Sequence, residues 1–122
     1  MALSVLNEIE EQNLQQNCKF LGDFFTKKLG TLRSKYEIVG DVRGKGLMIG
    51  IEFVKDKLSK KPLAVGDMAK IRQNCLKRGV IVGGGGLFMN VIRIVPPMCV
   101  TEQDLIGAFE AIDAGIAEFL AE

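Results

Sequence analysis

The sequence predicts an α+β domain of two layers, in which helices cover a small, mostly antiparallel sheet. In three segments, apolar residues recur every three or four positions, as they do in amphipathic helices. Between these segments lie short runs rich in valine and isoleucine that are bounded by glycine or proline, which is typical of strands. The chain has 122 residues, of which 48% are hydrophobic and 25% charged, so it is long enough to form one packed domain.

The chain is expected to begin with a long helix over residues 3–32, a segment without proline. One face of this helix is rich in Glu, Gln and Lys and should look outward. The buried stripe on the other face would consist of Leu6, Ile9, Leu14, Cys18, Leu21, Phe25, Leu29 and Leu32.

Two strands, over residues 36–39 and 47–54, should follow and flank a tight turn at Gly44 to Gly46. Apolar side chains alternate along the second strand and share one of its faces, as shown by Leu47, Ile49, Ile51 and Phe53. Because Met48 and Val54 on the other face are also apolar, this strand is expected to be covered on both sides.

The middle of the chain predicts a second helix over residues 67–78, for which Gly79 provides the C-terminal stop. A short strand over residues 80–82 should come next. The four consecutive glycines of Gly83 to Gly86 favour a flexible hairpin loop. Their backbone N–H groups could instead hold an anion, although no P-loop sequence surrounds them.

A last strand over residues 91–95 is ended by Pro96 and Pro97, which cannot extend a ladder. Thr101 then caps a final helix, with Asp104 three residues later in a capping-box arrangement. The expected buried stripe of this helix is Leu105, Phe109, Ile112, Ile116 and Leu120.

The composition excludes several classes of function. The chain contains no histidine, which removes Ser–His and Cys–His nucleophile pairs as well as histidine metal ligands. Three widely spaced cysteines without a CxxC pair argue against a disulfide scaffold or a zinc site and fit a reducing compartment. Cys18 and Cys75 occupy apolar helix positions and are expected to be buried thiols.

Charge and hydropathy exclude two further classes of partner. The net charge is +1, and the densest basic stretch, residues 55–61, has no aromatic residues and is expected to be a solvated loop. We therefore expect no nucleic-acid partner. No apolar run is long enough to cross a bilayer, so no membrane partner is expected.

Arg93 is the strongest candidate for a binding residue. It interrupts an otherwise apolar strand, Val91-Ile92-Arg93-Ile94-Val95. Its guanidinium either reaches solvent or meets a carboxylate in a cleft, and its planar fork suits the second role because it can form two parallel hydrogen bonds.

Two stretches give the chain a family resemblance. The run Gly40-Asp41-Val42-Arg43-Gly44-Lys45-Gly46-Leu47-Met48-Ile49-Gly50-Ile51-Glu52 resembles a signature in the small C-terminal domain of class III aminotransferases. The segment Arg93-Ile94-Val95-Pro96-Pro97, followed by Thr101-Glu102, is similar to the end of the same domain. The resemblance extends over essentially the whole chain.

The resemblance implies that residues 1–122 form the small domain of a fold type I pyridoxal-phosphate enzyme whose large domain is absent. In the family, a lysine and an aspartate of the large domain hold the cofactor, and no lysine of this chain matches that motif. The chain alone should therefore bind no pyridoxal phosphate or metal and contain no catalytic residue. Arg93 would hold the substrate carboxylate, and Arg43 would brace the turn.

A narrower similarity lies in Gly40 to Glu52 and in Met98 to Thr101. It implies a mitochondrial enzyme that transfers an amino group from an amino acid such as alanine to a keto acid such as glyoxylate. Its partners would be these substrates, the large domain and, as is usual in the family, further copies of the enzyme. Related phospholyases share the Pro-Pro-Met-Cys run and remain an alternative, as does a free-standing module that binds an anion at Gly83 to Gly86.

Overall fold

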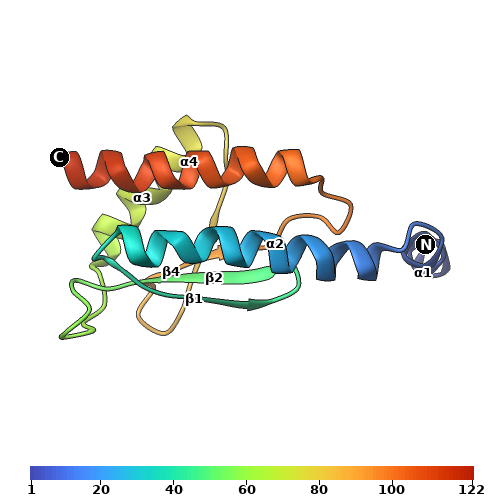
Figure 1. The fold of residues 1–122 in the computed structure, drawn as a ribbon, viewed down its shortest axis with the longest axis horizontal. Helices are drawn as coiled ribbons and strands as arrows, with labels where there is room; N and C mark the ends of the chain where they lie inside the picture. Colours follow the sequence, from blue (N-terminus) through green and yellow to red (C-terminus); the bar gives the residue numbers. More distant parts are fainter.

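The computed structural model describes residues 1–122 and confirms an α+β domain of two layers (Figure 1). The helices are α1 (Ala2–Glu11), α2 (Leu14–Lys35), α3 (Val65–Lys77) and α4 (Glu102–Ala121). The strands are β1 (Val39–Lys45), β2 (Met48–Phe53), β3 (Gly83–Gly85) and β4 (Val91–Ile94). The four strands form one sheet in the order β1-β2-β4-β3, and every neighbouring pair is antiparallel.

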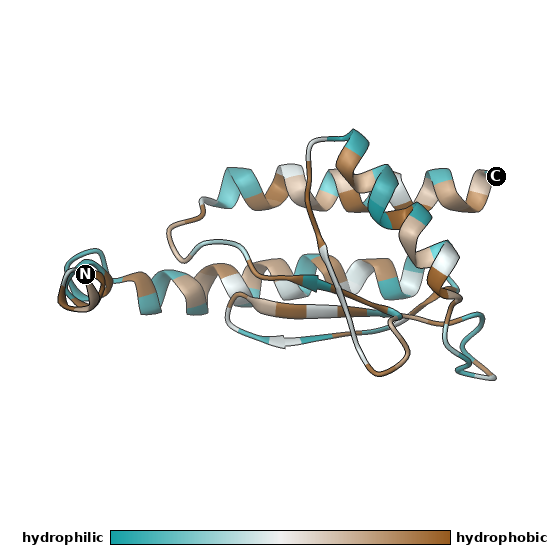
Figure 2. Ribbon diagram, turned by 180° about the vertical axis from the view of Figure 1, so that it is seen from behind, coloured by the Kyte–Doolittle hydropathy of each residue, from teal (hydrophilic) through white to brown (hydrophobic).

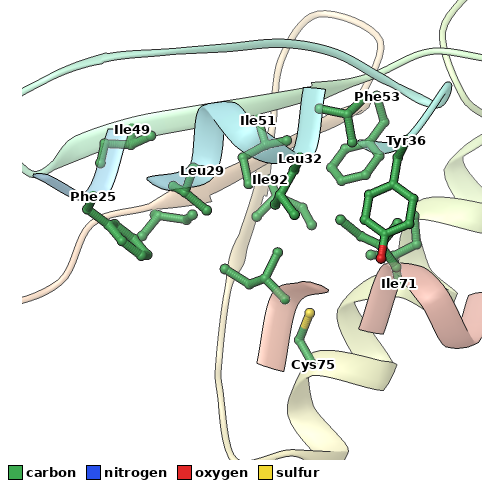
Figure 3. Close-up of a cluster of buried hydrophobic side chains, with 14 of the residues drawn as sticks. Phe25, Leu29, Leu32, Tyr36, Ile49, Ile51, Phe53, Ile71, Cys75 and Ile92 are labelled. Carbon is green, nitrogen blue, oxygen red and sulfur yellow. The ribbon is translucent and has the colours of Figure 1, made fainter. Parts of the chain in front are cut away.

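α2, α3 and α4 lie on one face of the sheet, whereas α1 lies beyond the end of the sheet, as both ribbon views show (Figures 1 and 2). Side chains of α2 point toward β2 and β4 in the centre of the molecule (Figure 3). There Phe25, Leu29 and Leu32 are fully buried. The strand residues Ile49, Ile51 and Ile92 are at most 1% exposed. Burial of each such side chain contributes about 1.5–3 kcal/mol to folding, so this contact layer is the main source of stability.

The predicted single N-terminal helix is wrong, because the chain forms two helices that are separated at Gln12 and Asn13. Asn13 adopts a left-handed conformation with φ of 51°, which asparagine tolerates better than most residues. The break turns α1 away from α2 (Figure 1). No residue of α1 is buried, so the expected apolar stripe is buried only from Leu21 onward.

The first hairpin lies later in the chain than expected. Residues 36–39 were expected to form the first strand, but β1 begins at Val39 and continues through the predicted turn to Lys45. The turn is formed by Gly46 and Leu47, because Lys45 pairs with Met48. Gly46 has a φ of 57°, a conformation that glycine adopts without steric cost.

The second hairpin is also displaced. The glycines predicted to form a loop are paired as strand β3, which lies beside β4, whereas residues 80–82 precede that strand. Backbone pairing alone specifies β3, since its residues have no side chains. The expected strand over residues 91–95 is confirmed as β4.

The two later helices agree with the sequence. Met68, Ile71 and Cys75 of α3 are fully buried, and Gly79, with a φ of 82°, follows its end. Thr101 and Asp104 form the predicted capping box at the start of α4. Leu120 departs from the expected stripe because it is exposed near the C-terminus.

The sheet has an uncovered outer face, contrary to the expectation that β2 is covered on both sides. Ile49 and Ile51 face the helices, but Met48 on the other face is 64% exposed, and of the apolar residues expected there only Val54, just beyond the end of β2, is buried. Of the cysteines, Cys75 is buried as expected, Cys18 is only half-buried and Cys99 is exposed. None of the helices combines the length and the apolar composition that crossing a bilayer requires.

Candidate functional site

A row of alternating arginine and glycine residues crosses the outer face of the sheet. Arg43 of β1 lies opposite Gly50 of β2, and Gly50 lies opposite Arg93 of β4. Arg93 in turn lies opposite Gly83 of β3. We call these four residues the arginine–glycine row. Because paired residues point to the same face of a sheet, both guanidinium groups stand on the uncovered side.

Arg43 is neutralised by two carboxylates of the same hairpin. Its Nη1 lies 2.7 Å from Glu52 Oε2 and 3.1 Å from Asp41 Oδ2. The hydrogen bonds to Glu52 and then to Asp41 raise the pKa of the Arg43 guanidinium above its usual value. Arg43 therefore braces β1 against β2 across the sheet, and its charge is compensated within the hairpin.

Arg93 has no such partner. It forms no ion pair and no side-chain hydrogen bond within the chain, although its neighbours Ile92 and Ile94 are buried on the other face. The strand thus anchors the backbone of Arg93 in the core and leaves its guanidinium exposed. An uncompensated guanidinium on a rigid strand can bind a carboxylate by donating two parallel hydrogen bonds to its oxygens.

The surroundings of Arg93 are open. Two hollows of the surface, of about 780 and 450 Å³, lie elsewhere. One lies between α2 and the turn at Gly46, and the other lies near Asp41 at the β1 edge. A single exposed ion pair contributes at most about 1 kcal/mol, so Arg93 alone cannot hold a small acid tightly. Any binding pocket at Arg93 needs additional walls.

A second unpaired arginine lies on the opposite side of β3. Arg72 of α3 occupies the space that a Cβ at Gly84 would take, on the face that looks toward the helices. Three of the four consecutive glycines, Gly83–Gly85, therefore form a paired strand rather than a loop. Because Gly83 and Gly84 have no side chains, they leave space for the side chains of Arg93 and Arg72.

The buried groups of the chain are unreactive. Burial raises the pKa of the Cys75 thiol to about 11, so it stays protonated and unreactive at neutral pH. The buried polar side chains are Asn74 and Asn90, and both donate hydrogen bonds to backbone carbonyl groups. No group of three or more potential metal ligands occurs.

Comparison with known proteins identifies the family. Residues 1–116 match the family described as Aminotransferase class-III. The chain belongs to the class III aminotransferases. Family members are enzymes, and the chain covers only part of such an enzyme.

Relatives and solved structures agree with this assignment. The mitochondrial alanine–glyoxylate aminotransferase 2 of Homo sapiens is 42% identical over 96% of this chain, which covers 23% of the relative. An alanine/serine racemase of Pyrococcus horikoshii is 40% identical over 98% of this chain, which covers 24% of it. The structure of a Bacillus anthracis aminotransferase superimposes with a TM-score of 0.92 at 28% identity, over 96% of this chain and 27% of that structure. The chain thus spans about a quarter of the length of these class III proteins.

Class III aminotransferases imply pyridoxal phosphate in the parent enzyme, but the residues of this chain do not form a site for it. Such a site needs a lysine that bonds to the cofactor and an acidic partner for the pyridine nitrogen. No lysine or acidic residue of this chain is buried, and the arginine–glycine row contains neither.

The sequence singled out Arg93 as a candidate binding residue, and that role stays a prediction; the residues around Arg93 could not be foreseen. Glu52, which pairs with Arg43, and the two glycines beside Arg93 come from neighbouring strands, so only the pairing register reveals them. An arginine in an apolar strand was the one signal that the sequence contained.

Proposed function

We propose that this chain is the small domain of a transaminase that transfers an amino group from an amino acid such as alanine to a keto acid such as glyoxylate. Arg93 holds the substrate carboxylate in this proposal. The observation that carries it is the unpaired guanidinium of Arg93 on the open face of the sheet, in a chain of the class III family. Holding the carboxylate fixes the direction of the substrate's Cα–H bond, which is the bond that transamination breaks.

The chain supplies one wall of the active site and is inactive alone. The cofactor and the remaining walls come from the large domain of the same enzyme. Exposed apolar side chains beside β4 support this contact, because such patches mark interaction surfaces. Leu87, Phe88 and Val95 are all at least 60% exposed. The loop between β3 and β4 is hydrophobic and projects from the sheet (Figure 2).

Substitution of Arg93 in the whole enzyme tests the assignment. The substrates to compare are L-alanine and 2-aminopropane, which is alanine with a methyl group in place of the carboxylate. Arg93→Ala should lower kcat/KM for L-alanine by about 10- to 100-fold, which is the effect expected when a hydrogen bond to a charged group is lost. It should lower kcat/KM for 2-aminopropane much less. Arg93→Lys should restore part of the loss.

A matched control comes from the other unpaired arginine. Arg72→Ala removes a guanidinium from the opposite face of β3 and should leave the ratio of the two kcat/KM values within about threefold of its original value. If Arg93→Ala also leaves that ratio unchanged, Arg93 does not bind the carboxylate.

A racemase is a second candidate, because a racemase of amino acids is 40% identical to this chain. Both reactions require a carboxylate grip, so Arg93 does not distinguish them. Incubation of the whole enzyme with L-alanine and no keto acid does. Formation of D-alanine over many turnovers would establish racemisation, whereas a transaminase stops after one half-reaction.

Two wider properties are part of the proposal. The enzyme is placed in mitochondria because the human relative is named a mitochondrial protein. We also propose that it assembles as a homo-oligomer, with most of the interface formed by the large domain. Size-exclusion chromatography with light scattering, applied to the whole enzyme and to this chain, tests the second point.

A further inference from the structure

Gly83 contacts Arg93 more closely than any other glycine does. A Cβ built at Gly83 would lie 3.5 Å from Arg93 Nε and 3.7 Å from Arg93 Cβ. On the other side of Arg93, a Cβ at Gly50 would approach only Val91, at 3.2 Å, and no atom of Arg93 within 4 Å. The Arg93 side chain therefore leans over β3 and away from β2.

The backbone at Gly83 does not require glycine. Its φ lies outside the left-handed region, unlike that of Gly86 at 88°. Strands generally favour β-branched residues and disfavour glycine. Since neither backbone conformation nor strand propensity accounts for Gly83, the space above it is the feature that distinguishes this position.

We propose that Gly83 is a positioning residue that sets the direction of the Arg93 guanidinium. This inference rests on the proposed function of Arg93. Because position 83 has no side chain, the aliphatic part of the Arg93 side chain can pack directly against the backbone of β3. This packing fixes the direction in which the planar guanidinium meets a carboxylate. Bidentate recognition depends on this direction, because both N–H groups must align with the two carboxylate oxygens.

The geometry predicts a graded response to side-chain size. An alanine at position 83 would make ordinary van der Waals contacts with Arg93, between 3.4 and 3.7 Å. A valine adds two methyl groups beyond Cβ, and in a strand these have few rotamers with which to avoid the aliphatic part of Arg93. Gly83→Val should therefore displace the guanidinium, whereas Gly83→Ala should be tolerated.

Gly85 provides a matched control. It lies two residues further along β3, so its side of the strand is the same as that of Gly83. A Cβ at Gly85 would meet nothing within 4 Å. Gly85→Val thus adds the same bulk and the same strand propensity to the same strand without touching Arg93.

The test uses the whole enzyme and the ratio of kcat/KM for L-alanine to that for 2-aminopropane. Gly83→Val should lower this ratio at least about tenfold through a higher KM for L-alanine, and Gly83→Ala and Gly85→Val should keep it within about threefold. Both rates come from the same preparation, so the folded fraction cancels. Gly83→Thr, which has the same branching, replaces Gly83→Val if the latter does not fold.

A second measurement does not depend on turnover. Propionate, a carboxylate without an amino group, should protect Arg93 from modification by phenylglyoxal in the original enzyme and in Gly85→Val. It should protect Arg93 much less in Gly83→Val, as quantified by mass spectrometry of the Arg93 peptide.

The outcomes separate the two proposals. If Arg93→Ala lowers the ratio but Gly83→Val leaves it unchanged, Gly83 does not position Arg93 and the proposed function stands. If Arg93→Ala leaves the ratio unchanged, both proposals fail. An equal loss in Gly83→Val and Gly85→Val would overturn the positioning role, because it would reflect bulk on β3 alone.

Discussion

The two faces of the sheet are built from the same strands but have opposite properties. The inner face presents Ile49, Ile51 and Ile92 to the helices and is almost completely dry. The outer face presents Met48, Glu52 and Arg93 to solvent. Successive residues of a strand point to opposite faces, so a shift of one residue in register would exchange these two surfaces. The inner face therefore fixes where each residue of the outer face stands, including Arg93.

The largest effect on stability is expected from a substitution on the inner face of the sheet. Ile51→Ala removes a fully buried side chain between α2 and the sheet and should lower the free energy of unfolding by about 2–5 kcal/mol. Urea unfolding of this chain, followed by circular dichroism, measures the change.

Met48→Ala is the matched control on the outer face of the same strand. Its effect should stay within about 0.5 kcal/mol, because Met48 is largely exposed. A cost similar to that of Ile51→Ala would show that both faces of β2 are packed.

The second effect concerns how closely α2 approaches the sheet. A side chain at Gly22 would overlap the backbone of Gly46. Gly22→Ala should therefore force the helix away from the hairpin and lower the free energy of unfolding by about 1–3 kcal/mol. A Cβ at Gly30, on the same helix, would meet nothing within 4 Å. Gly30→Ala should instead raise the free energy of unfolding by up to about 1 kcal/mol, because alanine favours the helix more than glycine does. Thermal melts of the two variants should therefore shift in opposite directions, and equal shifts would contradict the close packing.

The smallest effect concerns a polar contact at the edge of the helical layer. Asp113 of α4 accepts a hydrogen bond from Tyr36 Oη at 2.5 Å and one from Lys35 Nζ at 2.9 Å. Burial raises the pKa of Asp113, but the hydrogen bonds from Lys35 and Tyr36 outweigh burial and bring the pKa below its usual value. The lowered pKa means that Asp113 stabilises the fold above about pH 4, and that this contribution is lost as the pH falls through its folded pKa.

Asp113→Asn should accordingly lower the free energy of unfolding by about 1 kcal/mol at pH 7. The difference in this free energy between the variant and the original chain should shrink as the pH falls below about 4. Urea unfolding at several pH values measures this. Asp23→Asn, at an exposed position of α2 without an ion pair, should change neither quantity. A constant difference at all pH values would mean that the Asp113 charge is not involved.

The inner face could be predicted from the sequence, whereas most of the outer face could not. Alternating apolar residues such as Ile49 and Ile51 identify β2, because burial of one face leaves a period of two in the sequence. The residues of β1 and β3 have no such pattern. Asp41, Arg43 and the glycines pair through their backbone with β2 and β4, so tertiary structure rather than a local sequence pattern decides these strands.

The break between α1 and α2 was missed for a similar reason. The apolar period continues through Asn13, and only the backbone conformation of that residue shows that the helix ends. At the candidate site, Arg93 stands out in the sequence because a charged residue interrupts an apolar strand, and its binding role stays a prediction. The role proposed for Gly83 depends on its position opposite Arg93, which lies ten residues away in the sequence and adjacent in the sheet.

The glycine strand also affects how the sheet opens. β3 is an edge strand that pairs only with β4, and each of its glycines weakens the strand by about 0.5–1 kcal/mol relative to alanine. Amide hydrogens that pair β3 with β4 should therefore exchange with solvent by local opening, while those between β2 and β4 exchange only when the core unfolds. Arg93 is thus fixed to the rigid centre of the sheet and rests against its most easily opened margin.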